Sequence, residues 1–179
     1  MIEPIDSIQR QRVIEETTRY LSMAENLYHR QFNPVPIHFD LSGSSAGMFK
    51  IKGKESRIRY NPWLFAKYFE ENFNSTIPHE VAHYIVHCRH GLHRVRPHGP
   101  EWQAVMAAFG ADATVTGDFD LSGIPTRRQR RWRYHCDCRE HEVSTRHHNT
   151  VRAGRARYAC RLCNGELRFV AENPDIPVN

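Results

Sequence analysis

The sequence lacks a long run of apolar residues, and no stretch approaches the roughly 18 consecutive apolar residues that a membrane span requires. Its first residues, Met1 to Asp6, contain neither the basic nor the apolar segment of a secretory signal. We therefore expect a cytoplasmic protein that binds no membrane. A disordered chain is excluded too, because 40% of the 179 residues are hydrophobic and 11% are aromatic, which is sufficient for a folded core.

Cysteine is scarce, with five residues in the chain, and four of them form two close pairs. These four are Cys136, Cys138, Cys160 and Cys163. A reducing compartment disfavours a disulfide framework, and the spacing is typical of a zinc ribbon, in which four thiolates hold one structural Zn²⁺. The one-residue gap of the first pair is short for such a site, which leaves His135 or His141 as alternative ligands. The fifth cysteine, Cys88, is interpreted as a small buried apolar residue.

Lysine is absent from residues 127–168, although this segment carries 12 Arg against 4 acids, a net charge of +8. The rest of the chain has 13 Lys and Arg against 16 acids, a net charge of −3. Arginine suits phosphate groups and aromatic rings can stack on unpaired bases, so we predict that this segment binds nucleic acid; a solvated basic face is the alternative. The expected contacts are Arg127, Arg128, Arg130, Arg131, Trp132, Arg133, Arg152, Arg155 and Arg157.

The pattern His-Glu-x-x-His occurs at His79, Glu80 and His83. Residues four apart lie on the same face of a helix, so two imidazoles can bind one Zn²⁺ while the Glu between them reaches the attacking water. The pattern indicates a zinc-dependent hydrolase. A catalytic zinc usually has three protein ligands, and the residues after the helix offer several candidates for the third. Those candidates are His90, His93, His98 and Glu101. Spacing leaves His98 and Glu101 as the main alternatives, while His87 lies too far from His79 on an unbroken helix.

Periodicity of apolar residues predicts an α+β fold, with helices and a small, mostly antiparallel sheet. We expect an amphipathic helix over residues 7–31, with Asp6 or Ser7 as its N-cap. Its predicted buried face consists of Ile14, Thr18, Leu21, Ala24 and Tyr28. Three β-prone runs follow between residues 34 and 61 and predict a three-stranded sheet. Three further helices are expected to start at Pro62, to cover about 76–90 with Ser75 or Thr76 as N-cap, and to cover 100–109.

The segment from Pro78 to His83, followed by His98-Gly-Pro-Glu-Trp102, resembles the SprT/Spartan family of zinc metalloproteases, especially its short bacterial SprT members. The segments Phe39–Gly47 and Arg57–Pro62 and the cysteine-rich module agree with this resemblance, which covers roughly residues 8–168. It implies a minimal zincin-like core in residues 1–110. A connector with a basic run at 111–132, a zinc ribbon at 133–171 and a tail at 172–179 are expected to follow.

The same resemblance implies ligands and substrates. His79, His83 and His98 would hold a catalytic zinc, Glu80 would act as acid and base, and a second, structural zinc would lie in the ribbon. Eukaryotic relatives cleave proteins covalently trapped on DNA, so the expected partners are DNA and proteins bound to it, and the nucleoid is an expected location. A non-catalytic, regulatory zinc protein that binds nucleic acid is the alternative. The sequence does not indicate an oligomeric state.

Overall fold

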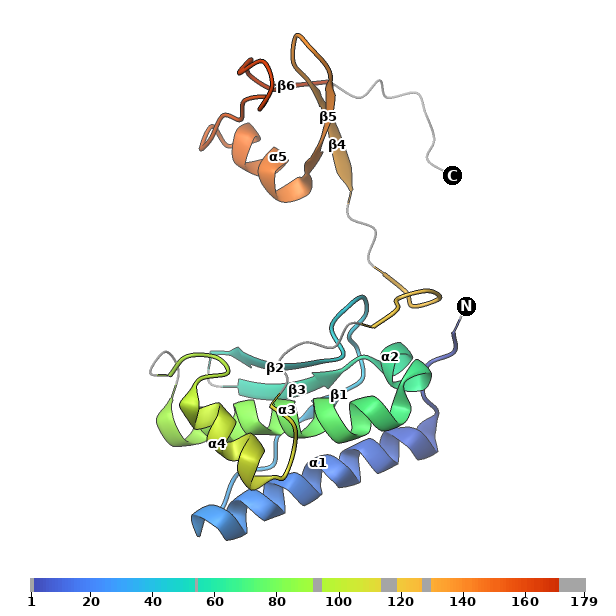
Figure 1. Ribbon diagram of the computed structural model, residues 1–179, viewed down its shortest axis with the longest axis vertical. Coiled ribbons are helices and arrows are strands. Elements are labelled where there is room, and N and C mark those ends of the chain that lie inside the picture. The colour runs from blue at the N-terminus through green and yellow to red at the C-terminus, as the bar shows by residue number, and fades with distance from the viewer. Residues whose placement is uncertain (1, 54, 92–94, 114–118, 127–129, 171–179) are drawn as a thin grey trace. The chain divides into compact units, whose positions relative to one another are not determined.

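In the computed structural model the chain divides into two units, residues 1–127 and 128–179, and each is described by itself. The structure describes residues 2–53, 55–91, 95–113, 119–126 and 130–170 (Figure 1). The first unit contains α1 (Ser7–Tyr28), β1 (Ile37–His38), β2 (Gly47–Lys52), β3 (Glu55–Tyr60), α2 (Pro62–Lys67), α3 (Phe69–His90) and α4 (Pro100–Ala108). The second contains β4 (Arg131–His135), β5 (Glu140–Ser144), α5 (Thr145–Arg152) and β6 (Arg168–Phe169). The predicted α+β fold class is confirmed.

The sheet of the first unit has the strand order β1-β3-β2, so β2 is an edge strand. β2 and β3 pair antiparallel from Gly47 opposite Tyr60 to Lys52 opposite Glu55, while β1 pairs with β3 in parallel over two residues. Residues along β2 alternate between half-buried and exposed. One face of the sheet therefore packs on the helices and the other faces solvent, as expected for an antiparallel sheet.

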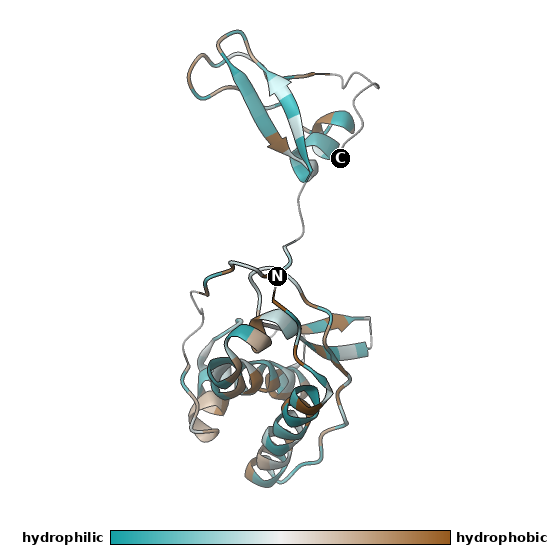
Figure 2. Cartoon of the chain, turned by 90° about the vertical axis from the view of Figure 1, so that its right-hand side faces the viewer, coloured by the Kyte–Doolittle hydropathy of each residue, from teal (hydrophilic) through white to brown (hydrophobic). Residues whose placement is uncertain are grey.

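Helices α1 and α3 run side by side and pack against each other (Figure 1). Apolar side chains of all four helices and of the sheet form the core of the first unit. Figure 2 shows the hydropathy of the residues along these elements. α2 is fixed by Asn61, which is fully buried and whose Oδ1 accepts hydrogen bonds from the amides of Trp63 and Leu64 at 3.2 Å. The side-chain NH₂ of Asn61 donates to the carbonyls of Gly43 and Ser45, so Asn61 also holds the loop before β2.

Helix α1 begins as predicted but buries a different face. Asp6 is the N-cap, and its side chain accepts a hydrogen bond from the Gln9 amide at 2.8 Å. The buried residues are Val13, Thr17, Tyr20 and Ala24, so the predicted stripe was wrong by one position except at Ala24. This face is buried because the polar Thr17 has hydrogen-bond partners there. Its hydroxyl donates to the Val13 carbonyl at 2.7 Å and lies 3.0 Å from the Tyr60 hydroxyl of β3.

Helix α3 begins at Phe69, seven residues before the predicted start at 76, and this part of the prediction was wrong. Ser75 and Thr76 lie inside the helix and cap nothing, and Pro78 interrupts its hydrogen bonds. The extra turns are held by Asn72, which is fully buried and whose amide donates to the Leu64 and Tyr68 carbonyls. Its Oδ1 accepts a hydrogen bond from the Thr76 hydroxyl at 2.8 Å.

The first unit also includes part of the predicted connector. The Lys67 ammonium donates to the Asp120 carboxylate at 2.8 Å, and the side chain of Ile124 is buried. Residues 114–118, 127–129 and the predicted tail at 172–179 lie outside the described residues. In the described part of the chain, no helix is long and apolar enough to cross a membrane.

The second unit is a three-stranded antiparallel sheet in the order β5-β4-β6, with α5 following β5. Its small core contains Tyr134, Val143 and His148, all buried. The His148 imidazole stacks on the Trp132 ring at 3.7 Å with an angle of 3° between the planes. The helix α5, which the sequence did not predict, thus packs on the sheet through the buried His148 imidazole, and its first residue, Thr145, accepts a hydrogen bond from the Trp132 indole at 3.2 Å.

Candidate metal centres

Three imidazoles from two segments converge in the first unit. His79 and His83 lie one turn apart on α3, and His98 lies in the turn before α4. Their Nε2 atoms are separated by 3.1 Å (His79 to His83), 3.0 Å (His83 to His98) and 3.0 Å (His79 to His98). Atoms at such separations lie on a circle of about 1.75 Å radius, so an ion at the usual Zn–N distance of about 2.0–2.1 Å reaches all three. The donor set fits zinc.

The turn before α4 gives His98 its position. Its backbone is left-handed, with φ of 56°, which is uncommon for a residue with a side chain. The turn is closed by the Gly99 amide, which donates to the Arg96 carbonyl at 3.0 Å, and by the Gln103 side chain, which donates to the His98 carbonyl. Within the described residues, the group of metal-ligating atoms here consists of His79, His83 and His98, and does not include Glu101. His93 lies outside the described residues.

Trp102 packs against all three imidazoles, and sequence reasoning gave it no role. Its ring centroid lies 4.8 Å from His79, 5.7 Å from His83 and 4.7 Å from His98. The side chain is 1% exposed, and its indole N–H donates to the His79 carbonyl at 3.3 Å. The available signal was its position four residues after His98, which is one helical turn. Trp102 restricts the orientation of all three rings.

Burial keeps these imidazoles neutral. It lowers the pKa of His79 to about 4 and that of His83 to about 3, with a smaller contribution from the neighbouring imidazoles. The pKa of His98 is lowered for the same reason. All three rings are thus neutral near pH 7, and the neutral form is the one that binds a metal.

Glu80 lies between the first two histidines and is held by the backbone of β2. Its Oε2 accepts a hydrogen bond from the Phe49 amide at 2.6 Å, and the residue is 6% exposed. Burial raises its pKa to about 8, and the Phe49 amide opposes this shift. A Cβ added to Gly47 would lie 2.6 Å from Glu80 Cγ and 2.7 Å from its Oε1. Only glycine therefore fits at position 47, a constraint that sequence reasoning missed.

Four thiols converge in the second unit. Cys136 and Cys138 flank the turn between β4 and β5, and Cys160 and Cys163 lie in the turn before β6, with all four sulfurs within 4.8 Å of one another. The distance from Cys136 to Cys138 is 3.4 Å and that from Cys138 to Cys160 is 3.7 Å. A tetrahedral site with Zn–S distances of about 2.3 Å separates its sulfurs by about 3.8 Å, so this donor set also fits zinc.

His141 contacts the thiol cluster without belonging to the group of four. Its Nε2 lies 3.2 Å from Cys136 Sγ, and this hydrogen bond lowers the pKa of Cys136 to about 7. The amides of Cys163 and Leu162 lower the pKa of Cys160 to about 5. Hydrogen bonds with the neighbouring thiols raise the pKa of Cys138 to about 12, and a bound cation would favour its thiolate form. His135, the other proposed substitute ligand, is exposed.

Most arginines predicted to contact nucleic acid are exposed where the structure describes them. Those exposed residues are Arg130, Arg131, Arg133, Arg152, Arg155 and Arg157. Arg133 pairs with Glu140 at 3.1 Å and Arg157 with Glu166 at 3.7 Å. The predicted contacts Arg127 and Arg128 lie outside the described residues.

Trp132 is half-buried, and its ring packs within the unit. Besides its stack on His148, the ring receives the Arg130 guanidinium at 3.9 Å. These contacts occupy ring surface that the predicted stacking on bases would use. The role of Trp132 and of the arginines in nucleic-acid binding stays a prediction.

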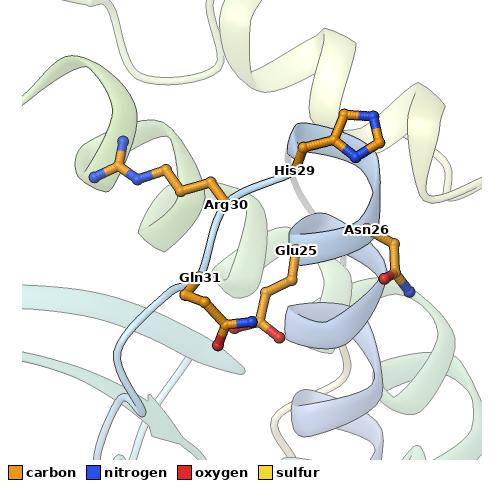
Figure 3. Close-up of a pocket in the computed structure, with 5 residues that line it drawn as sticks. All are labelled: Glu25, Asn26, His29, Arg30 and Gln31. Carbon is orange, nitrogen blue, oxygen red and sulfur yellow. The ribbon is translucent and has the colours of Figure 1, made fainter.

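A separate open pocket lies at the end of α1. It is lined by Glu25, Asn26, His29, Arg30 and Gln31. The Glu25 carboxylate already accepts a hydrogen bond from the Phe32 amide at 3.0 Å, and the Arg30 side chain points away from the other four (Figure 3). The pocket contains no cluster of metal ligands among the described residues.

Comparison with known proteins gives a consistent result. The model of the SprT-like family matches residues 17–129. Protein SprT of Pasteurella multocida strain Pm70 is 34% identical over 157 residues, which cover 87% of this chain and 91% of the relative. Protein SprT of Vibrio parahaemolyticus is 37% identical over 151 residues, which cover 83% of this chain and 87% of the relative. No solved structure matches the chain. The chain therefore belongs to the SprT-like family.

Proposed function

We propose that the chain is a zinc-dependent endopeptidase that acts on proteins bound or crosslinked to DNA. The observation that carries this proposal is the convergence of three histidine Nε2 atoms within 3.1 Å beside the buried carboxyl of Glu80. A purely structural zinc site needs no carboxylate between its ligands, whereas peptide hydrolysis needs a group that accepts and returns a proton. The family to which the chain belongs supports the same function.

The chain's own residues have distinct parts in this mechanism. His79, His83 and His98 would hold the zinc, which supplies Lewis-acid activation of water and of the peptide carbonyl. Glu80 takes the proton from the attacking water and returns it to the leaving amine. The Phe49 amide holds the Glu80 carboxyl, and a divalent cation nearby favours its ionised form.

The second unit is proposed to bind nucleic acid. Its charge supports this, because residues 127–168 carry a net +8 while the rest of the chain carries −3. Within the described part of the chain, Arg131, Arg152 and Arg155 are exposed and form no ion pair. Arginines that are free in this way can bind phosphate groups. We infer that a structural zinc binds the four cysteines and that it holds the exposed arginines of the second unit in place.

An assay on a crosslinked substrate tests the proposal. A model protein crosslinked to a DNA oligonucleotide and the same protein without DNA are each incubated with the zinc-loaded chain. We expect the crosslinked protein to be cut faster than the free protein, because the second unit holds the enzyme on the DNA molecule that carries the substrate. Chelation of the zinc should abolish cleavage. If neither form is cut, the alternative of a non-catalytic zinc protein that binds nucleic acid replaces the proposal.

Gly47→Ala is expected to lower kcat about 10- to 100-fold with zinc content unchanged. The new methyl group would meet Thr76 Cγ2 at 2.6 Å and Glu80 Cγ and Oε1 at 2.6 and 2.7 Å, so both side chains must shift. Misplacement of a catalytic group by about 1 Å costs rate on this scale. The control is Met48→Ala, whose side chain lies on the exposed face of β2. Steady-state kinetics and metal analysis check the result. Equal kcat values for Gly47→Ala and Met48→Ala would show that Gly47 does not position Glu80.

A further inference from the structure

One hairpin of the first unit has an excess of positive charge. Residues 46–60 contain five Lys and Arg against one acid, a net charge of +4. The other residues up to 126 contain eight Lys and Arg against 13 acids, a net charge of −5. The hairpin of β2 and β3 is therefore a cationic segment within an otherwise acidic unit.

The cations of this hairpin gather on the exposed face of the sheet. Lys50 and Lys52 are exposed on β2, on the face opposite to Phe49, which packs on the core. Arg57 of β3 stands directly opposite Lys50 in the register. Residues in such a pair have Cβ atoms about 4.5–5.5 Å apart, and like charges at that distance destabilise a sheet.

Glu55 stands opposite Lys52 in the register, but no acid stands opposite Lys50. Arg59 is neutralised, because its Nε donates to the Asp40 carboxylate at 2.7 Å and holds the pKa of that carboxyl below its usual value. Among the residues that the structure describes, Lys50, Lys52 and Arg57 form no ion pair. Three cations thus remain available on one exposed face.

We infer that this exposed face of β2 and β3 is a second surface for the phosphodiester backbone of nucleic acid. Lys50 and Lys52 lie two residues apart on a strand, about 6.8 Å. This is close to the distance between neighbouring phosphates of one nucleic-acid strand, because the 3.4 Å rise per step is only the axial part of that distance. The surface contains no base-reading element and binds backbone charge alone.

The choice of nucleic acid as the ligand of this surface rests on the proposed function, but binding at the surface requires no proteolysis. Its position on β2 is informative, because the same strand supplies the Phe49 amide that holds Glu80. Nucleic acid on the exposed face would therefore lie against the strand that borders the candidate catalytic residue. A protein attached to that nucleic acid would be brought close to the site.

Lysine reactivity tests the inference directly. The four lysines of the chain are Lys50, Lys52, Lys54 and Lys67, and residues 127–168 contain none, so acetylation of lysine reports on the first unit alone. We expect an oligonucleotide to slow acetylation of Lys50 and Lys52 at least several-fold. Lys67, which is bound to Asp120, is the internal control and should keep its rate. Unchanged rates at Lys50 and Lys52 would overturn the inference, and so would protection by polyglutamate alone, which indicates an acidic protein as the partner.

Salt dependence of binding by the full chain gives a second measurement. The variant Lys50→Gln/Lys52→Gln/Arg57→Gln should reduce the slope of log affinity against log salt by about 2 to 3, because each phosphate contact contributes about 0.7–0.9. Its melting temperature should stay near the wild-type value, because removal of the like-charged Lys50–Arg57 pair offsets the loss of the Lys52 charge opposite Glu55. The control Arg12→Gln/Arg19→Gln/Arg30→Gln removes three cations from the α1 region and should leave the slope unchanged. Equal slopes for the two variants would contradict the inference.

A third variant separates this surface from the proposed function. Arg131→Gln/Arg152→Gln/Arg155→Gln removes unpaired arginines of the second unit. If this variant alone weakens binding, the hairpin surface fails while the proposed function stands. If the hairpin variant alone weakens binding, the hairpin surface stands and the assignment to the second unit fails. If the wild-type chain binds no oligonucleotide, both fail, and proteolysis is judged separately by the cleavage assay.

Discussion

Glu80→Gln is expected to lower the rate of peptide cleavage by about 10²- to 10⁴-fold and to leave the zinc content unchanged, the scale typical of losing a general acid and base. Glutamine has nearly the same shape, and its side-chain oxygen can still accept the hydrogen bond that the Phe49 amide donates to Glu80 at 2.6 Å. The fold and the three imidazoles are therefore kept. What is lost is the ability to take a proton from water and return it to the leaving amine.

The matched control is Glu71→Gln on the same helix. Glu71 is exposed in the first turn of α3, so its substitution makes the same change of charge away from the histidines. Elemental analysis of both proteins should give the wild-type zinc content, and kcat should fall for Glu80→Gln alone. Wild-type cleavage by a metal-replete Glu80→Gln protein would remove Glu80 from the mechanism. Loss of zinc from it would show that Glu80 supports the metal site.

The sequence predicted the elements of the fold better than their limits. The β-prone runs, the helix at Pro62 and the helix at Pro100 follow from local signals such as caps and prolines. The start of α3 did not follow from local signals, because the buried Asn72 donates to the carbonyl of Leu64 in α2 and to that of Tyr68 after α2, which no local pattern reveals. α1 offers two apolar stripes at helical spacing, and the hydroxyl contact between Thr17 and Tyr60 decides between them.

The candidate site was predictable where its chemistry is local. The four-residue spacing identifies His79 and His83 as a pair, and the Glu between them follows directly. Spacing left the choice of third ligand between His98 and Glu101 open, and the resemblance favoured His98. The structure places His98 Nε2 3.0 Å from the Nε2 atoms of both other histidines. Gly47 could not be found from sequence, because its role depends on an approach between β2 and α3 that only the folded chain creates.

The double substitution Cys160→Ser/Cys163→Ser is expected to unfold the second unit and to leave the first unit folded. The described part of the second unit buries few side chains, with Tyr134, Val143 and His148 prominent among them, and a core of this size does not hold a fold by itself. Structural zinc contributes about 10–16 kcal/mol of binding free energy in small zinc modules, and this free energy supports folding. Both cysteines are replaced because the His141 imidazole, 3.2 Å from Cys136 Sγ, could otherwise replace one lost thiolate.

Hydrogen exchange measured by mass spectrometry distinguishes the two units. Amides of residues 131–170 should lose protection, while those of α1 and α3 keep it, because the first unit has its own core. The control is Cys88→Ser, which removes the one cysteine outside the cluster and should leave residues 131–170 protected. If the double variant loses zinc and the second unit nevertheless stays protected, its stability must come from the stacking of Trp132, His148 and Phe169, whose ring centroids lie 3.7 to 5.9 Å apart. The metal would then fix only the two cysteine turns and not the sheet.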